Sequence, residues 1–203
     1  MKVVIIDYEM GNIKSISSAM KFLGVNEVVV SNKHSDILTA DRLILPGVGS
    51  FAKAMENIKQ FDLERCLRLA VEVDKKPILG ICLGMQLMCE SSKEDGLTEG
   101  LGFVPGKIER FDVQGLKVPH VGFNQVSFNN GSRLYEGMKD LSDFYFTHSF
   151  RLQSNERINQ AQCNYDSDFI ASYELANIAG VQFHPELSQT NGLKLIENFL
   201  KNF

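Results

Sequence analysis

The stretch Pro77-Ile78-Leu79-Gly80-Ile81-Cys82-Leu83-Gly84 predicts a buried strand that turns sharply into a helix. An apolar run leads into Gly-x-Cys-x-Gly, and the helix-like segment Met85-Gln86-Leu87-Met88-Cys89-Glu90 follows directly. This order is the nucleophile-elbow pattern with a cysteine sulfur at the nucleophile position. Glycine suits both flanking positions, because a sharp turn brings backbone close and demands unusual dihedral angles. The N–H groups that open the helix favour the thiolate of Cys82.

A second stretch supplies the groups that a catalytic thiol needs. Val181-Gln182-Phe183-His184-Pro185-Glu186 predicts a strand followed by a histidine and, two residues later, a carboxylate. Side chains i and i+2 of an extended segment lie on the same side, so His184 and Glu186 can be oriented together. Pro185 disfavours helical geometry at His184. Cys82, His184 and Glu186 are therefore our candidates for the nucleophile, the base and the group that orients the base.

The composition bounds the class of protein. The chain has 203 residues, of which 44% are hydrophobic and 23% charged, an ordinary globular balance. Its net charge of −4 argues against nucleic acid as the main partner, since phosphate binding needs a basic face. No apolar run approaches the roughly 20 residues that span a bilayer, and the N-terminal run is too short for a signal peptide. We expect a cytoplasmic protein without a membrane segment.

The four cysteines give no sign of a metal site or of disulfides. None forms Cys-x-x-Cys, and none lies near a histidine at zinc-ligand spacing. Cys66, Cys89 and Cys163 lie in apolar periodic contexts, which favours core packing over chemistry. Asp7 and Asn12 follow the first predicted strand, but the chain lacks Gly-x-Gly-x-x-Gly there, so no nucleotide site is predicted.

The first half of the chain alternates strand-like and helix-like segments. The predicted strands cover residues 3–7, 27–30, 42–45 and 78–81, and the predicted helices cover residues 12–23, 51–58 and 63–73. This alternation predicts an α/β fold with an open, mostly parallel central sheet and helices on both faces. Ligands of such sheets bind beyond the carboxyl ends of the strands. Cys82 and the loop Pro46-Gly47-Val48-Gly49 both fall at such ends.

The second half of the chain is dominated by short β-like runs. These runs cover residues 102–108, 117–128, 142–150, 158–165, 169–173 and 178–183, and turns such as Asn129-Asn130-Gly131 separate them. We expect them to extend the sheet with antiparallel strands, and we expect a final helix over residues 188–200. The sequence has no internal repeat or linker, so residues 1–203 are predicted to form a single domain.

Three of these segments together resemble one family. Pro46-Gly47-Val48-Gly49, the stretch Gly80–Gln86 and the stretch Gln182–Glu186 occur in the order and spacing of the class I (triad) glutamine amidotransferases. Within that family the chain is similar to the glutaminase subunits of imidazole glycerol phosphate synthase, from its first strand to its last helix. The segments Asp7–Asn12, Val118–Asn124 and Tyr145–Phe150 also resemble those subunits.

The resemblance implies hydrolysis of L-glutamine to glutamate and ammonia through a thioester on Cys82, with His184 moving the protons. The elbow geometry makes the N–H of Leu83 one donor to the oxyanion. The backbone of Val48 and Gly49 is expected to supply a second donor. The reaction needs no cofactor and no metal.

The resemblance also implies where the amino-acid head of the substrate binds. Gln86 lies one helical turn after Cys82 and is expected to face the same cavity, with the backbone of Ser149 and Phe150 nearby. His120 and His148 lie near the pocket or a partner interface by resemblance, although structural histidines are an equally good interpretation.

Free ammonia is largely protonated in water, so direct transfer to an acceptor enzyme is advantageous. The resemblance implies a heterodimer with a cyclase subunit of (β/α)8-barrel fold. The subunits usually carry tryptophan, tyrosine and lysine where this chain has Phe123, Phe150 and Leu187. These differences leave open an amidotransferase subunit that serves a sugar-modifying synthase. Two further alternatives are a hydrolase that acts alone and a non-catalytic interaction module.

Overall fold

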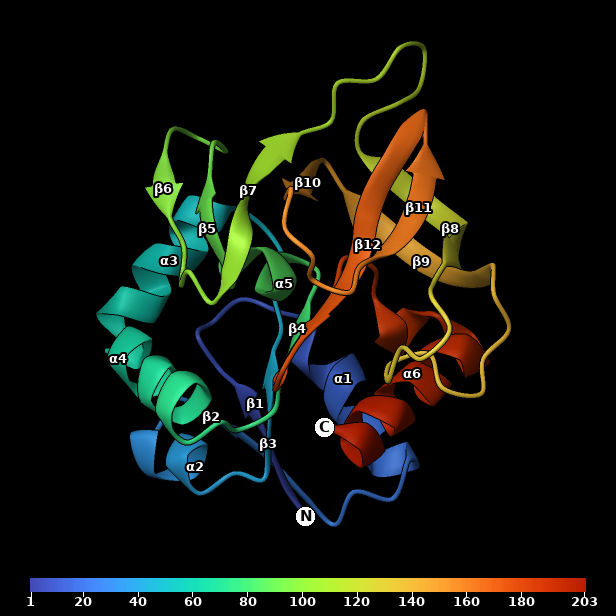
Figure 1. The fold of residues 1–203 in the computed structure, drawn as a ribbon. Helices are drawn as coiled ribbons and strands as arrows, with labels where there is room; N and C mark the ends of the chain where they lie inside the picture. Colours follow the sequence, from blue (N-terminus) through green and yellow to red (C-terminus); the bar gives the residue numbers. More distant parts are fainter.

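The computed structural model describes residues 1–203 and is organised around a nine-stranded sheet (Figure 1). Five neighbouring strands of this sheet run parallel, as the alternating first half predicted. In spatial order they are β2 (Glu27–Ser31), β1 (Lys2–Ile6), β3 (Arg42–Leu45), β4 (Ile78–Ile81) and β13 (Ile178–Val181). The three central strands of this half are apolar and nearly fully buried, which is what a parallel sheet covered on both faces requires.

The second half of the chain completes this sheet with antiparallel strands, which confirms that part of the prediction. The strands that continue from β13 are, in order, β12 (Ser167–Leu175), β11 (Ala161–Tyr165), β8 (His120–Ser127) and β9 (Ser142–His148). The run predicted over residues 178–183 forms only β13, which ends at Val181. Its pairing with β4 is parallel.

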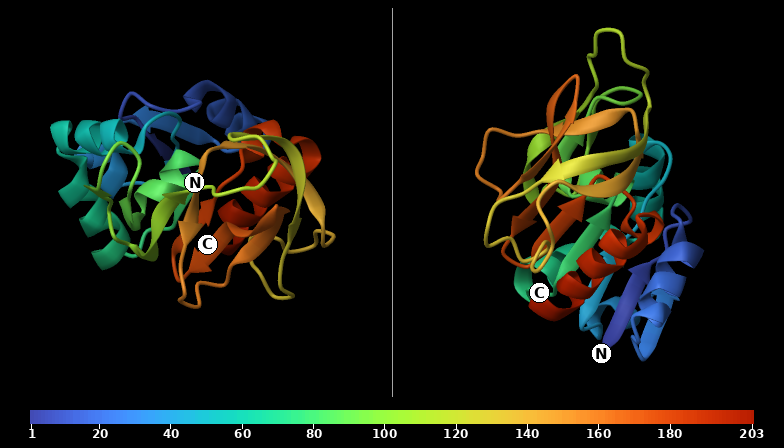
Figure 2. Two further views of the ribbon diagram at one scale, coloured as in Figure 1. Left: turned by 90° about the horizontal axis from the view of Figure 1, so that it is seen from above. Right: turned by 90° about the vertical axis from the view of Figure 1, so that its right-hand side faces the viewer.

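Helices cover both faces of the sheet, as the sequence predicted. Helices α1 (Ile13–Phe22) and α6 (Gln189–Asn202) lie side by side on one face (Figure 2), and α2 (His34–Leu38), α3 (Phe51–Gln60) and α4 (Leu63–Arg68) cover the other. Alternate residues of β1 enter different cores: Val3 and Ile5 pack with α1 and α6, whereas Val4 and Ile6 pack with α2 to α4.

A second sheet corrects the prediction that every late strand extends the first one. It has four strands in the order β10 (Phe150–Gln153), β7 (Val104–Arg110), β5 (Cys89–Ser92) and β6 (Thr98–Glu99). The predicted run over residues 102–108 therefore belongs here, where β7 pairs in parallel with β5. Helix α5 (Leu83–Leu87) ends before Cys89 and Glu90, which were expected to be helical. Strand pairing with β7 overrides the local helical pattern.

Two further segments differ from the sequence prediction. The helix expected over residues 63–73 is α4 followed by a π-helical turn at Leu69–Val73, where Asp74 donates its N–H to the carbonyl of Leu69. Helix α2 was not predicted, because its single turn offers too few apolar positions for a period.

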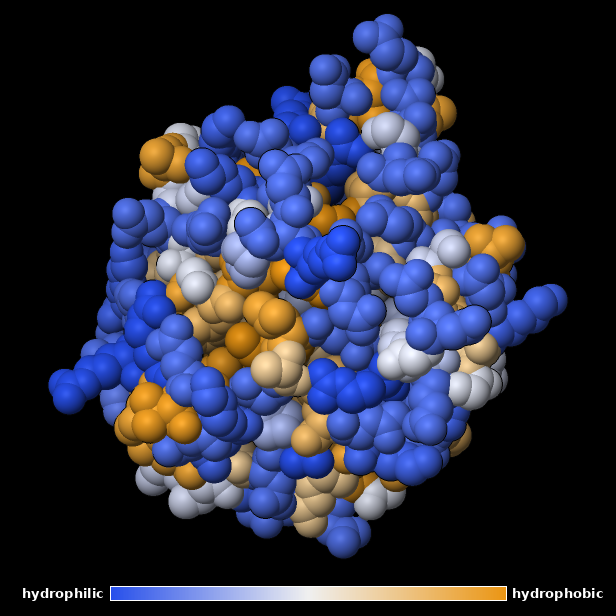
Figure 3. Space-filling view, in the orientation of Figure 1, coloured by the Kyte–Doolittle hydropathy of each residue, from blue (hydrophilic) through white to orange (hydrophobic).

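The face seen in Figure 3 is mostly hydrophilic, as expected for a chain with an ordinary globular composition. The apolar residues of this face are gathered in patches near its centre and at its rim (Figure 3). No helix of the structure has both the length and the apolar character needed to cross a membrane.

Candidate active site

Cys82 lies on a sharp turn between β4 and α5. Its φ of 53° and ψ of −111° are unusual for a residue with a side chain. The turn is packed so tightly that a Cβ on Gly84 would lie 1.8 Å from the carbonyl oxygen of Leu45. A Cβ on Gly80 would lie 2.7 Å from the backbone nitrogen and Cα of Met85. Both glycines of the motif are therefore needed for close approach, as the elbow pattern predicted.

The pairing of β4 with β13 brings Cys82 and His184 to the same edge of the sheet. Ile81 pairs with Val181, and the N–H of Cys82 donates to the carbonyl of Val181 at 2.8 Å. His184 follows three residues after β13, and its N–H donates to the carbonyl of Tyr145 at 2.8 Å. Residues about a hundred positions apart in the sequence thus meet at the carboxyl ends of two adjacent parallel strands.

His184 and Glu186 form the contact that the sequence predicted, but the backbone conformation between them differs from the predicted extended one. Nδ1 of His184 lies 2.9 Å from Oε1 of Glu186, and the two side chains are 4% and 0% exposed. The segment is not extended through Glu186, because Pro185–Leu187 forms a 3-10 turn. Nδ1 is occupied by Glu186, whereas the buried Nε2 has no hydrogen-bond partner.

The electrostatics of His184 favour the imidazolium. Burial lowers the pKa of this ring, but contact with Cys82 and Glu186 outweighs burial and raises it to about 10. The cause is the negative charge that the thiolate and the carboxylate place on either side of the ring. The buried ring of His184 therefore holds a proton that it can donate to a group in the cavity.

Cys82 and His184 line one cavity of about 290 Å³. The remaining residues predicted from the sequence line the same cavity, whereas Glu186 lies buried outside the lining. These lining residues are Val48, Gly49, Leu83, Gln86, Ser149 and Phe150. The volume suits a small molecule.

The loop that was predicted to help bind an oxyanion packs against the start of α5. A Cβ on Gly47 would lie 2.7 Å from both the amide nitrogen of Gly84 and Cβ of Leu83. The hydroxyl of Tyr8 donates to the carbonyl of Pro46 and so holds the loop in position. The N–H of Leu83 is in the first turn of α5, where no intrahelical acceptor exists. Both segments thus line the cavity that holds the thiol, through Val48 and Gly49 of the loop and through Leu83 of α5.

Gln86 has a fixed amide. Its Nε2 donates to the carbonyl of Phe150 at 3.1 Å and to Oε1 of Gln182 at 2.9 Å. Both N–H bonds are used, so the oxygen of Gln86 is left as the acceptor for a ligand in the cavity. Nε2 of Gln182 lies 3.8 Å from Sγ of Cys82.

Comparison with known proteins identifies the family. The family model for class-I glutamine amidotransferase matches residues 4–203. The chain belongs to the class-I glutamine amidotransferases. It is 47% identical to imidazole glycerol phosphate synthase subunit HisH 2 of Vibrio vulnificus over 98% of this chain and 94% of that protein. It is 44% identical to subunit HisH of Aquifex aeolicus, over 98% and 96% of the two chains.

Solved structures show the same fold at lower sequence identity. A glutamine amidotransferase matches with a TM-score of 0.75 and 20% identity, covering 98% of this chain and 97% of that one. PurLQS of Thermotoga maritima matches with a TM-score of 0.70 and 19% identity, covering 99% and 98%. The α/β architecture predicted from the sequence is therefore the fold of this amidotransferase family.

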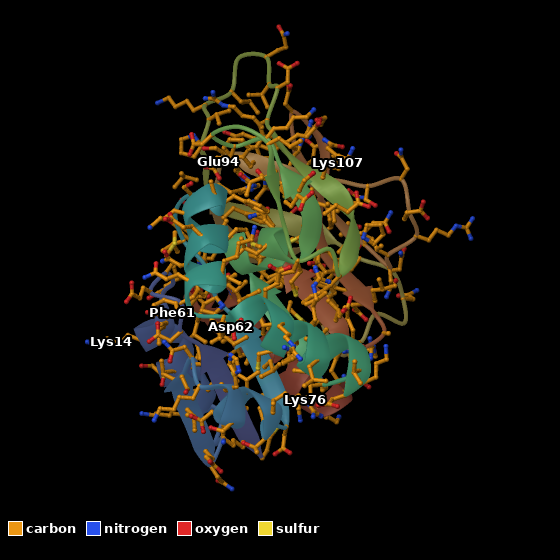
Figure 4. The ribbon with its side chains drawn as sticks, turned by 90° about the vertical axis from the view of Figure 1, so that its left-hand side faces the viewer. Lys14, Phe61, Asp62, Lys76, Glu94 and Lys107 are labelled. Atoms are coloured by element: carbon orange, nitrogen blue, oxygen red, sulfur yellow. The ribbon has the colours of Figure 1, made fainter.

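Sequence reasoning missed Glu94 in this amidotransferase. Its half-buried carboxylate lines the cavity, and Oε2 accepts the N–H of Phe51 at 2.9 Å at the start of α3 (Figure 4). Burial raises the pKa of Glu94, the hydrogen bond from Phe51 opposes this, and the neighbouring Asp95 raises it further. Lys93-Glu94-Asp95 has the composition of a solvated charged turn, so nothing local in the sequence marks this carboxylate.

Two polar residues that support the trio were also missed. Asn12 donates through Nδ2 to Oε1 of Glu186 at 3.2 Å. Gln182 is fully buried and connects Gln86 with Cys82. A glutamine within an apolar run is a signal that could have been used, because a buried amide needs partners. Asn12 offers no such signal, since 174 residues separate it from Glu186.

We predict that His184 keeps its proton to about pH 10 in the isolated chain. Glu186→Gln and Cys82→Ala should each lower this pKa, because each removes a negative charge beside the ring. The proton is bound more tightly in the folded chain, so its contribution to stability is complete below about pH 6.5 and is lost as pH rises through 10. NMR titration of the labelled histidines measures the pKa.

The matched control for this titration is Glu90→Gln, which neutralises an exposed carboxylate outside the cavity. This substitution should leave the pKa of His184 unchanged. A His184 that titrates near 6.5 in the wild type and in every variant would contradict the ion-pair arrangement.

Proposed function

We propose that this chain is the glutaminase subunit of an imidazole glycerol phosphate synthase, and that residues 1–203 form a single glutaminase domain. The observation that carries the proposal is that Cys82 and His184 line one cavity of a class-I glutamine amidotransferase, with Glu186 bound to the ring of His184. The relatives named as HisH support imidazole glycerol phosphate synthesis over amidation by a sugar-modifying synthase.

In the first half of the proposed reaction, the thiolate of Cys82 attacks the amide carbon of L-glutamine. The new C–S bond leaves negative charge on the amide oxygen. The N–H of Leu83 and backbone N–H groups of Val48 and Gly49 stabilise this oxyanion, and each such donor contributes about 3 kcal/mol. His184 passes its Nε2 proton to the amide nitrogen, the C–N bond breaks, and ammonia leaves a thioester on Cys82.

In the second half, neutral His184 removes a proton from water as the water oxygen attacks the thioester carbon. The same backbone donors stabilise the second oxyanion. Its collapse breaks the C–S bond, releases glutamate and restores the imidazolium–thiolate pair. Glu186 holds the ring so that Nε2 faces the reacting atoms, and Asn12 holds Glu186.

The cavity also supplies groups for the amino-acid head of the substrate. We infer that Glu94 and the amide oxygen of Gln86 bind the α-ammonium group, since both are acceptors on the lining. The backbone of Ser149 and Phe150 borders the same region and is expected to bind the remainder of the head.

The proposed partner is a cyclase subunit of (β/α)8-barrel fold that receives ammonia directly in a heterodimer. Three exposed apolar side chains, two in β8 and one directly after Glu186, support a docking surface: Val121 is 56% exposed, Phe123 50% and Leu187 42%. Phe123 shares a shallow pocket with Ser188, the residue after Leu187. We further propose that the protein acts in the cytoplasm, because all four cysteines are unpaired thiols.

The function is tested by glutamate release from L-glutamine. We predict turnover by the purified chain, measured alone and with candidate barrel subunits and their acceptor substrates. Cys82→Ala should reduce turnover by roughly 10³-fold or more, because the nucleophile is lost. Cys89→Ala, which removes a fully buried thiol outside the cavity, is the control and should remain active. An active Cys82→Ala variant, or no glutamate release under any of these conditions, refutes the proposal.

The role of Glu94 gives a separate prediction. Glu94→Gln removes the charge that faces the substrate ammonium while preserving shape and the acceptor for Phe51. A hydrogen bond between charged groups is worth about 1.5–3 kcal/mol, so KM for glutamine should rise about 10- to 100-fold with kcat nearly unchanged. Glu90→Gln is the matched control. An unchanged KM in Glu94→Gln would place the ammonium elsewhere.

A further inference from the structure

A buried pair of histidines lies beside the site and has no part in the mechanism above. His120 in β8 and His148 in β9 are opposite each other in the strand register. They are only 3% and 6% exposed, and their ring centroids are 5.1 Å apart. Aromatic rings enclose the pair, from Phe111, Phe146, Tyr165 and Phe169.

The hydrogen bonds of this pair permit one assignment of protons. Nδ1 of His148 lies 2.8 Å from the carbonyl oxygen of Phe150, which only accepts, so Nδ1 carries the proton. In the neutral ring Nε2 then accepts, and its partner at 3.1 Å is Nδ1 of His120, which must donate. Nε2 of His120 is left to accept from the side-chain amide of Asn124 at 3.4 Å. Both histidines are therefore Nδ1–H tautomers.

Their surroundings keep both rings neutral. Burial lowers the pKa of His120 to about 4 and that of His148 to about 3; the bond to Phe150 only partly offsets burial at His148. Each neutral ring has one N–H donor and one nitrogen acceptor. Two such rings form the three hydrogen bonds that run from Asn124 to the carbonyl of Phe150. The pair therefore forms a directional hydrogen-bond chain that ends on one carbonyl of the site.

That carbonyl is shared with the substrate site. The oxygen of Phe150 accepts from His148 and also from Nε2 of Gln86. Two donors occupy both lone pairs, so this peptide group cannot rotate without losing a bond. The amide of Gln86 points its two N–H bonds at this carbonyl and at Oε1 of Gln182, so its oxygen is left for a ligand.

We propose that His148, anchored by His120, is a positioning residue for glutamine binding: it holds the Phe150 carbonyl and so keeps the amide of Gln86 in the orientation that accepts the substrate ammonium. The proposal rests on the proposed glutaminase function. Without the ring donor, the Phe150 peptide can tilt and the amide of Gln86 can turn. The turned amide presents N–H groups to the ammonium and weakens binding.

The tautomers are tested first, by long-range ¹H–¹⁵N NMR of the histidine rings in the wild-type chain at neutral pH. We expect the Nδ1–H form for both His120 and His148. The Nε2–H form at His148 would overturn the proposal, because no donor would then face the carbonyl of Phe150. This measurement does not depend on glutaminase activity.

Kinetics test the consequence for binding. His148→Leu should raise KM for glutamine about tenfold and change kcat less than threefold. His148→Asn can place an amide N–H where Nδ1–H was and should restore KM to within about threefold of the wild type. Phe169→Leu, which removes a packed ring from the same cluster without touching the hydrogen-bond chain, should leave KM unchanged.

Each outcome has a definite consequence. Equal KM values in His148→Leu and His148→Asn, or a rise of the same size in Phe169→Leu, would show a packing role only and overturn the proposal. A wild-type chain with the expected tautomers but no glutaminase activity, alone or with any candidate barrel subunit and its acceptor substrate, would refute the proposed function itself. A wild-type chain that is active, with KM raised only in His148→Leu, supports both.

Discussion

The parallel pairing of β4 with β13 is the constraint on which the site depends. Each strand is only four residues long, yet their register fixes where two distant chain segments end. The bond from the N–H of Cys82 to the carbonyl of Val181 extends this ladder by one step into the elbow. A shift of the register would turn the side chains of one strand to the opposite face and separate the thiol from the ring.

The elbow stores backbone strain that the surrounding packing maintains. A residue in an unusual region of φ and ψ costs of order 1–3 kcal/mol and persists only when its neighbours over-determine it. Here Gly80 and Gly84 admit side chains and backbone to within distances that no Cβ tolerates, and Gly47 brings the neighbouring loop equally close. These close contacts at Gly47, Gly80 and Gly84 thus maintain the strained backbone of Cys82, which holds the sulfur at the N-terminus of α5.

Sequence was sufficient for the parts of the site that short segments encode. The elbow around Cys82 and the His184–Glu186 pair are local patterns with a chemical reason, and the alternation of strands and helices located their common edge. Glu94 and Asn12 could not be found this way, because only tertiary structure brings the charged turn of Glu94 to the cavity and Asn12 to Glu186. Strand β5 was missed for a related reason: its partners lie later in the chain, and local periodicity favoured a helix.

A cysteine-directed analogue of glutamine tests the central claim most directly. An analogue with a diazoketone in place of the amide alkylates a nucleophilic thiol only where glutamine itself binds, and mass spectrometry of the peptides identifies the modified residue. The account predicts a single label on Cys82, suppressed by excess glutamine, with Cys66, Cys89 and Cys163 unmodified. A label on one of these other cysteines, or labelling of Cys82 that glutamine does not suppress, would contradict it.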